Sequence, residues 1–315
     1  MERKKIYIAL IVFLLSAVAF MTYDTGVNLS YVIPKRFIRL GTMIIVASSI
    51  AYSSLIFQTL TQNKILTPSI MGYESVFILL QTIIVFIYGD KTFQVVSHTS
   101  NFFISILGMM VFSMFMYILL FKRGRNNIYH LLLIGLILGT LFETAGKFMQ
   151  VIIDPNEFSI IESHLFASFN KMNTDLLLVA GITLGLTFLI GARYIKYLDV
   201  IALGREHAIN LGLNYYKLVQ IYMVLISVMV SVSTALVGPI TFLGILVTNI
   251  TYQILKSYKH KYLLFACCVI SCITVIVGQF LVEHVFNFST AVSVIINFIG
   301  GIYFIYLIIK TRRSL

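Results

Sequence analysis

Glu143 and Lys147 lie four positions apart within a long apolar run. This spacing places both side chains on one face of a helix, where they can pair, and Thr140 and Thr144 flank them on a similar face. Ionisable side chains at membrane depth are costly and usually face a partner or a cavity. The cluster is therefore predicted to be either a structural ion pair or part of a pathway for a polar solute.

A second polar cluster, GREHAINLGLNYYK (204–217), separates two apolar runs. It has the pattern of a short helix, in which Ala208 and Leu211, three positions apart, form a small apolar face. Its candidate contact residues are Gly204, Arg205, Glu206, Ala208, Leu211 and Gly212. Its chemistry suits equally a helix lying on the membrane surface and a docking element for a soluble partner.

Residues 145–147, Ala-Gly-Lys, resemble part of a phosphate-binding loop, but Leu141 and Phe148 occupy the positions where the Walker pattern needs Gly and Ser or Thr. The histidines lack the paired spacing of metal ligands. Three cysteines share one apolar run, where thiols act as small hydrophobes: Cys267, Cys268 and Cys272. The chain is predicted to have no catalytic residue, no metal site and no bound cofactor.

The elements that carry these residues are predicted to be membrane-spanning helices. Of the 315 residues, 59% are hydrophobic and only 11% charged, whereas soluble domains have about 25% charged residues. The continuous apolar runs predict an all-α protein of about ten transmembrane helices. Gly238-Pro239 divides the longest run, because proline rarely lies inside a helix. The predicted spans are 6–23, 38–60, 66–88, 101–121, 128–150, 176–195, 216–236, 240–256, 262–282 and 288–309.

The distribution of charge predicts the orientation of these helices. With both termini in the cytoplasm, the cytoplasmic connections hold most Lys and Arg residues, including the cluster at 122–125, as the positive-inside rule requires. The outer bases are Lys35, Arg36, Arg39, Lys91 and Lys171. The longest outer connection, about 151–175, is predicted as a loop with a turn at Asp154-Pro155-Asn156. The net charge of +11 thus indicates topology in the cell membrane, and no nucleic-acid partner is expected.

Arg36 and Arg39 stand at the outer mouth of the second span, against the general charge bias. Arginines near span ends commonly extend their side chains to lipid phosphates. Alternatively, the pair is a docking point for an acidic protein partner, since complementary charges steer association and fix its register.

Four segments resemble one family, the FecCD/BtuC type of ABC importer permease. Residues 36–72 resemble its Arg-x-Pro-Arg…Gln-x-Leu-x-x-Asn-x-Leu-x-x-Pro-x-x-x-Gly block. Residues 203–213 resemble its Leu-Gly-x-x-x-Ala-x-x-Leu-Gly-Val signature, and GPITFLGILVTNI (238–250) is similar to Gly-Pro-Ile-x-Phe-x-Gly-x-x-x-Pro-His. Residues 298–308 resemble the closing Gly-x-Pro-x-Phe segment. The matching residues of the first block are Arg36, Arg39, Gln58, Asn63, Leu66, Pro68 and Gly72.

The sequence departs from these motifs at Ile38, Thr248-Asn249 and Ile302. Each change removes a proline and with it a rigid backbone position. These departures affect local kinks rather than the resemblance as a whole.

The resemblance implies one permease domain, residues 1–315, with the type II importer fold. Coupling helices at about 196–215 would contact one of two separate ATPase subunits, which bind ATP and Mg. Arg36 and Arg39 would dock an extracellular substrate-binding lipoprotein, and residues 140–147 would line the translocation pathway. A second permease subunit would complete that pathway as a homologous heterodimer, or alternatively a homodimer.

The expected cargo is a ferric siderophore, because the residues of the fifth span and its loop resemble those of catechol-siderophore permeases of Gram-positive bacteria. Haem and cobalamin are the alternatives within the family. An ion-coupled secondary transporter using Glu143 and Lys147 is the alternative outside it. The inverted repeats common in such transporters are not visible in the sequence.

Overall fold

The computed structural model describes residues 2–23, 29–121, 128–170 and 174–312, and these contain helices and no strand. The basic cluster at 122–125 and Lys171, which helped to predict the orientation, lie outside them. The longer helices are α1 (Glu2–Thr22), α2 (Leu29–Thr61), α3 (Tyr73–Tyr88), α5 (His98–Phe121), α6 (Ile128–Ile152), α8 (Thr174–Ile201), α10 (Tyr215–Val237), α12 (His260–His284) and α13 (Val292–Arg312). The shorter elements are η1 (Ser69–Met71), η2 (Gly89–Lys91), α4 (Thr92–Val95), α7 (Pro155–Leu165), α9 (Arg205–Asn210) and α11 (Leu243–Ile254).

Within the described residues, six helices are long and apolar enough to cross a membrane: α1, α2, α5, α8, α10 and α12. The shorter apolar helices are α3, α11 and residues 292–306 of α13. The protein is therefore a multi-pass membrane protein. The count of ten spans is not confirmed, because the predicted spans 66–88 and 240–256 correspond only to the short helices α3 and α11.

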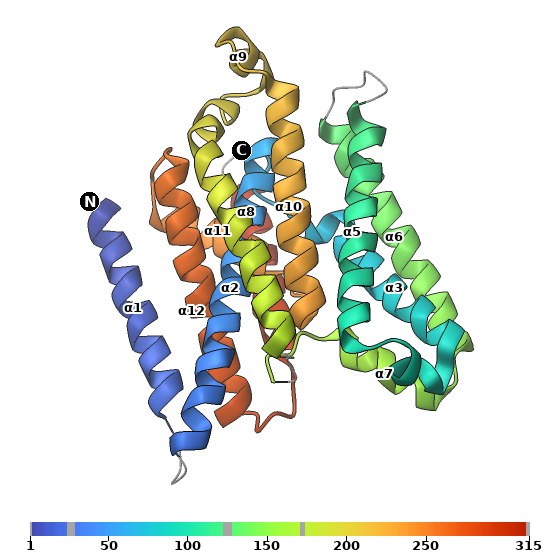
Figure 1. The fold of residues 1–315 in the computed structure, drawn as a ribbon. Helices are drawn as coiled ribbons and strands as arrows, with labels where there is room; N and C mark the ends of the chain where they lie inside the picture. Colours follow the sequence, from blue (N-terminus) through green and yellow to red (C-terminus); the bar gives the residue numbers. More distant parts are fainter. Residues whose placement is uncertain (1, 24–28, 122–127, 171–173, 313–315) are drawn as a thin grey trace.

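The bundle is organised around α2, whose apolar window is 72% buried. α8, α10, α11 and α12 pack against it, and α1 lies at the edge of the bundle against α12 (Figure 1). α3, α5, α6 and α7 form a second group, joined to the first where α5 packs on α10. α9 and the N-terminus lie toward one end of the molecule, and α7 lies at the other.

α7 corrects the prediction of a loop between residues 151 and 175. The predicted turn is a helix start, since the Asp154 side chain accepts a hydrogen bond from the Asn156 backbone and Pro155 is the first helical residue. The start signal of this helix, Asp154 followed by Pro155, was thus present in the sequence.

The short helices α3 and α11 begin after segments that contain no α-helix, 62–72 and 238–242, and polar contacts join the residues in and around these segments. The break predicted at Gly238-Pro239 is confirmed, because α10 ends at Val237. Gln58 donates a hydrogen bond to the Thr248 hydroxyl at 2.9 Å, and Asn249 donates to the Lys64 carbonyl at 3.0 Å. Thr241 likewise donates to the buried Glu74 carboxylate at 2.5 Å. Two motifs far apart in the sequence thus form one junction, which satisfies backbone groups that the interrupted helices leave free.

Candidate coupling, docking and translocation sites

α9 is a six-residue helix bounded by two glycines in the left-handed half of conformational space. Gly204 has φ +105° and Gly212 has φ +81°, conformations that residues with a Cβ rarely adopt. A Cβ on Gly204 would also lie 3.1 Å from the Gln62 side-chain nitrogen, just beyond α2. The two glycines therefore determine the path of the chain into and out of α9. Gly204 also places the N-terminal end of α9 against the end of α2.

The predicted helical range of 196–215 and the predicted apolar face are both corrected. α8 runs to Ile201, and only Arg205–Asn210 form a separate helix before α10 starts at Tyr215. Ala208 is fully buried against the body of the protein, whereas Leu211 is 64% exposed. α9 ends at Asn210 and Leu211 follows as its C-cap residue, so Leu211 is exposed while Ala208 is covered, and the two do not form a shared exposed face. The exposed apolar side chains at this end are Leu203, Ile209 and Leu211.

The two charged residues of α9 have different environments. Arg205 donates a hydrogen bond to the Tyr216 hydroxyl at 2.5 Å, with its guanidinium 5.5 Å from the centre of that ring. Glu206 is exposed. Arg205 therefore fastens α9 to the start of α10, and Glu206 is the acid presented to the surroundings.

A histidine–aspartate pair that the sequence did not reveal secures the end of α8 that leads to α9. Asp199 accepts hydrogen bonds from the backbone nitrogen of His260 at 2.8 Å and contacts its Nδ1 at 2.7 Å. His260 Nε2 lies 3.0 Å from the Thr59 hydroxyl of α2. α2, α8 and α12 are thus joined close to α9. Asp199 and His260 are 61 residues apart, and no spacing rule relates them.

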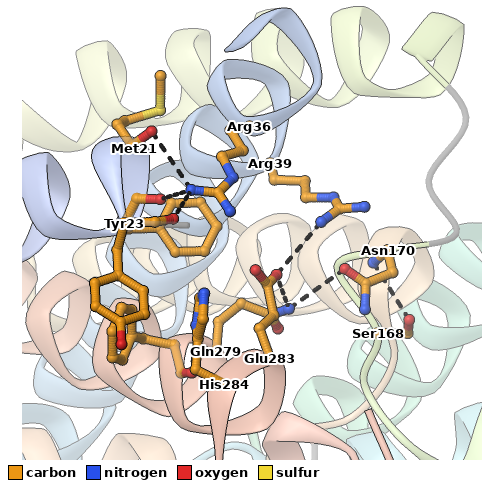
Figure 2. Close-up of polar contacts among 11 residues, drawn as sticks. Met21, Tyr23, Arg36, Arg39, Ser168, Asn170, Gln279, Glu283 and His284 are labelled. Atoms are coloured by element: carbon orange, nitrogen blue, oxygen red, sulfur yellow. Dashed lines mark hydrogen bonds and ion pairs between the residues drawn. The ribbon is translucent and has the colours of Figure 1, made fainter. Parts of the chain in front are cut away.

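Arg36 lies inside the protein and caps the end of α1. Its guanidinium donates to the carbonyl oxygens of Phe20, Met21 and Tyr23 at 2.9, 3.4 and 2.6 Å (Figure 2). These carbonyls have no partners within their own helix, and a cation at a helix C-terminus is favourable. The Arg36 side chain therefore links the end of α1 to α2. Docking of a partner protein by Arg36 stays a prediction.

Arg39 faces a polar cluster at the same end of the molecule (Figure 2). Its guanidinium lies 3.3 Å from the Glu283 carboxylate, which also accepts a hydrogen bond from Gln279 at 2.7 Å. Gln279 in turn donates to Asn170 at 3.3 Å. The Arg39 side chain is 27% exposed and that of Glu283 only 6%, so part of the guanidinium can still meet an acidic partner.

The ion pair predicted on α6 is present. Lys147 Nζ lies 2.6 Å from Glu143 Oε1, and the two side chains are 70% and 51% exposed. The hydroxyls of Thr140 and Thr144 donate to backbone carbonyls of their own helix, and both residues are exposed. The structure thus brings all four residues together on one exposed face of α6.

The orientation of that face depends on a close contact between two glycines. Gly72 joins η1 to α3 with φ +95°, and a Cβ there would lie 2.8 Å from Gly139 Cα on α6. A Cβ on Gly139 would lie 3.1 Å from Gly72 Cα. The backbones of Gly72 and Gly139 are therefore in direct contact. This contact fixes the rotation of α6 about its axis, and with it the outward orientation of its polar face.

Among the described residues, no group of three or more His, Cys, Asp or Glu side chains could hold a metal ion. The polar side chains that the sequence analysis missed are mainly single residues within apolar runs. They are Glu74, Asp199, His260, Gln279 and Glu283. Each contacts a residue at least 61 positions away in the sequence.

The long apolar helices around α2, the two interrupted helices and the polar helix at one end define a transport permease of the membrane. The chain belongs to the FecCD transport family, whose model matches residues 6–310. It is 49% identical to the petrobactin import system permease protein YclO of Bacillus subtilis, over 94% of this chain and 93% of that protein. It is 32% identical to the petrobactin import permease FatC of Bacillus anthracis, over 99% and 90%.

A solved structure titled as an inward-facing conformation of a metal-chelate type ABC transporter shares the fold. It superposes with a TM-score of 0.84, at 21% sequence identity, over 98% of this chain and 100% of that chain. The predicted family and the permease fold are therefore confirmed.

Proposed function

We propose that this permease carries a ferric siderophore of the petrobactin class across the cell membrane, driven by ATP hydrolysis on separate subunits. The observation that carries the proposal is the 49% identity, over almost the whole chain, to a petrobactin import permease. The second relative has the same named cargo, which favours a siderophore over haem or cobalamin. The chain's own contribution is conformational: it opens the pathway on one side of the membrane and then on the other.

α9 is the proposed contact with an ATPase subunit that binds ATP and Mg. It projects from one end of the bundle and exposes Ile209 and Leu211 (Figure 1). A displacement of α9 by the ATPase would be transmitted to α2 through the contact at Gly204. It would be transmitted to α10 through the contact between Arg205 and Tyr216. This end is then cytoplasmic, as are both termini, in agreement with the positive-inside rule.

A second permease is the proposed partner for the exposed face of α6. YclN of Bacillus subtilis, also named a petrobactin import permease, is 22% identical to this chain over 88% of it, which supports a heterodimer of homologous subunits. At the outer end, Arg39 is the proposed contact for an acidic residue of a substrate-binding lipoprotein. Arg39→Ala is accordingly expected to weaken the binding of that lipoprotein to the complex.

Reconstituted proteoliposomes test the proposed transport. The complete complex, with both permeases, the ATPase and the binding protein, is expected to take up ⁵⁵Fe-labelled ferric petrobactin when ATP is supplied to the ATPase side. Uptake should persist when ionophores collapse the ion gradients. Uptake that vanishes with the gradients, and persists without ATP, would restore the secondary-transporter interpretation.

The Glu143–Lys147 pair is proposed to line the pathway for this polar chelate. Glu143→Ala and Lys147→Ala are each expected to lower uptake about tenfold, the effect of losing a hydrogen bond to a charged group. An exposed pair four residues apart contributes only about 0.3–0.5 kcal/mol to stability, so the thermal stability of both variants should stay near that of wild type. Lys91→Ala, at an exposed lysine outside α6, is the matched control. Normal uptake by both alanine variants would reduce the pair to a structural element.

A further inference from the structure

A lateral groove between α1, α8 and α12 has no part in the proposed transport cycle. Its volume is about 740 Å³, and Tyr52 of α2 contributes to its wall. α1 packs mainly against α12 at the edge of the bundle, and only 6% of its apolar window is buried. The groove therefore lies at the edge of the bundle and opens sideways, toward the bilayer.

The groove is apolar along its length and basic at one end. Its charged lining residues are Arg3, in the first turn of α1, and Lys261, in the first turn of α12. From these two residues to Leu10 and Cys268, the deeper lining residues on the same helices, the helical rise is about 10 Å. The apolar lining includes Ile6, Leu10, Phe188, Leu189, Leu264 and Phe265. A ligand that matches this surface has a negatively charged head and a hydrocarbon chain.

Tyr52 of α2 contributes its ring, and not its hydroxyl, to the deeper part of the groove. The hydroxyl is buried, and a Cβ on Gly191 of α8 would lie 2.6 Å from it, so it faces α8. The ring packs edge-on against Phe188, with 5.3 Å between the ring centres, and extends the apolar wall. The groove therefore selects a ligand by its basic end and its apolar walls.

We propose that this groove binds one anionic phospholipid. Arg3 and Lys261 hold the phosphate-bearing head, and an acyl chain lies along α1, α8 and α12. Basic residues near the cytoplasmic surface attract anionic lipids, whereas a zwitterionic lipid has no net charge to attract. An inorganic anion would match the basic end and leave the apolar walls uncovered.

Native mass spectrometry of the purified complex tests this binding. The complex is reconstituted in nanodiscs of phosphatidylcholine with one quarter phosphatidylglycerol, and the phosphatidylglycerol retained after transfer to detergent is counted. Wild type is expected to retain one phosphatidylglycerol per copy of this chain, in preference to phosphatidylcholine. The Arg3→Gln/Lys261→Gln double variant should retain about 30-fold less, since each of the two basic residues near a lipid surface contributes about 1 kcal/mol. The matched control is Lys4→Gln/Lys259→Gln, which removes the same charge from exposed positions outside the groove.

A second variant fills the groove without altering charge. A Cβ on Gly185 would meet no atom within 4 Å, so Gly185→Leu can fold with its side chain in the groove, and it should also lose the bound lipid. Gly301→Leu, on α13 and equally open, is its control and should retain the lipid. Equal retention of the two lipids by wild type would overturn the proposal, as would equal loss in both charge variants. Full retention by Gly185→Leu would also overturn it.

Discussion

Gly72→Val is expected to leave little correctly folded permease. Valine would have to adopt φ +95°, in the left-handed region that costs L residues about 1–2 kcal/mol. Its Cβ would also lie 2.8 Å from Gly139 Cα, and overpacking of this kind costs about 1–3 kcal/mol. Because the opposing atom belongs to the backbone, no side-chain rotation can relieve the contact, and α6 has to move away from α3.

Thermal unfolding in detergent measures this effect through the three cysteines of α12, two of which are buried and all of which become reactive on unfolding. A thiol-reactive dye suits this chain because it has no tryptophan. Gly301→Val is the control, since a Cβ there meets no atom within 4 Å and the position has no positive φ. An unfolding temperature for Gly72→Val equal to that of Gly301→Val would contradict the backbone contact.

Leu211→Glu is expected to abolish uptake while leaving the permease folded. Leu211 is 64% exposed at the end of α9, and a carboxylate there would have to enter an apolar contact with the ATPase subunit. Residues central to such contacts are worth about 2 kcal/mol or more, so binding of the ATPase should weaken roughly 30-fold. Affinity is measured with immobilised permease complex, and uptake is measured in proteoliposomes.

Tyr258→Glu provides the comparison for this variant. Tyr258 is 93% exposed in the connection between α11 and α12, so the same charge enters a solvent-facing site outside α9. It should bind the ATPase as wild type does. If Leu211→Glu also keeps full ATPase affinity and uptake, α9 is a surface helix of the membrane and another segment couples the subunits. Ala208→Arg would not separate these outcomes, because Ala208 is buried and a large side chain there would disturb α9 itself.

The sequence sufficed for features that local chemistry determines. Apolar runs predicted the helical membrane fold, Gly238-Pro239 predicted the end of α10, and the spacing of Glu143 and Lys147 predicted their ion pair. The sequence also contained an unused signal at Asp154-Pro155, the N-cap and first residue of α7.

Features that depend on packing between distant segments could not be predicted. A six-residue helix has too few turns for its pattern to tell which side is buried, so the burial of Ala208 appears only in the structure. Arg36 looked like a surface cation because nothing in the sequence indicates that α1 ends beside it. The Arg39–Glu283 contact joins residues 244 apart, and only the packing of α2 on α12 brings them together.

The shortness of α11 has a consequence for how the chain enters the membrane. With 12 residues, α11 is well below the roughly 20 needed to cross the hydrocarbon alone, and the segment before it, 238–242, is not α-helical. The partners for its polar side chains, Gln58 and the Lys64 carbonyl, are made almost two hundred residues earlier. We therefore expect stable insertion of α11 to depend on its packing against α2 and α12, and not on the partitioning of this helix by itself.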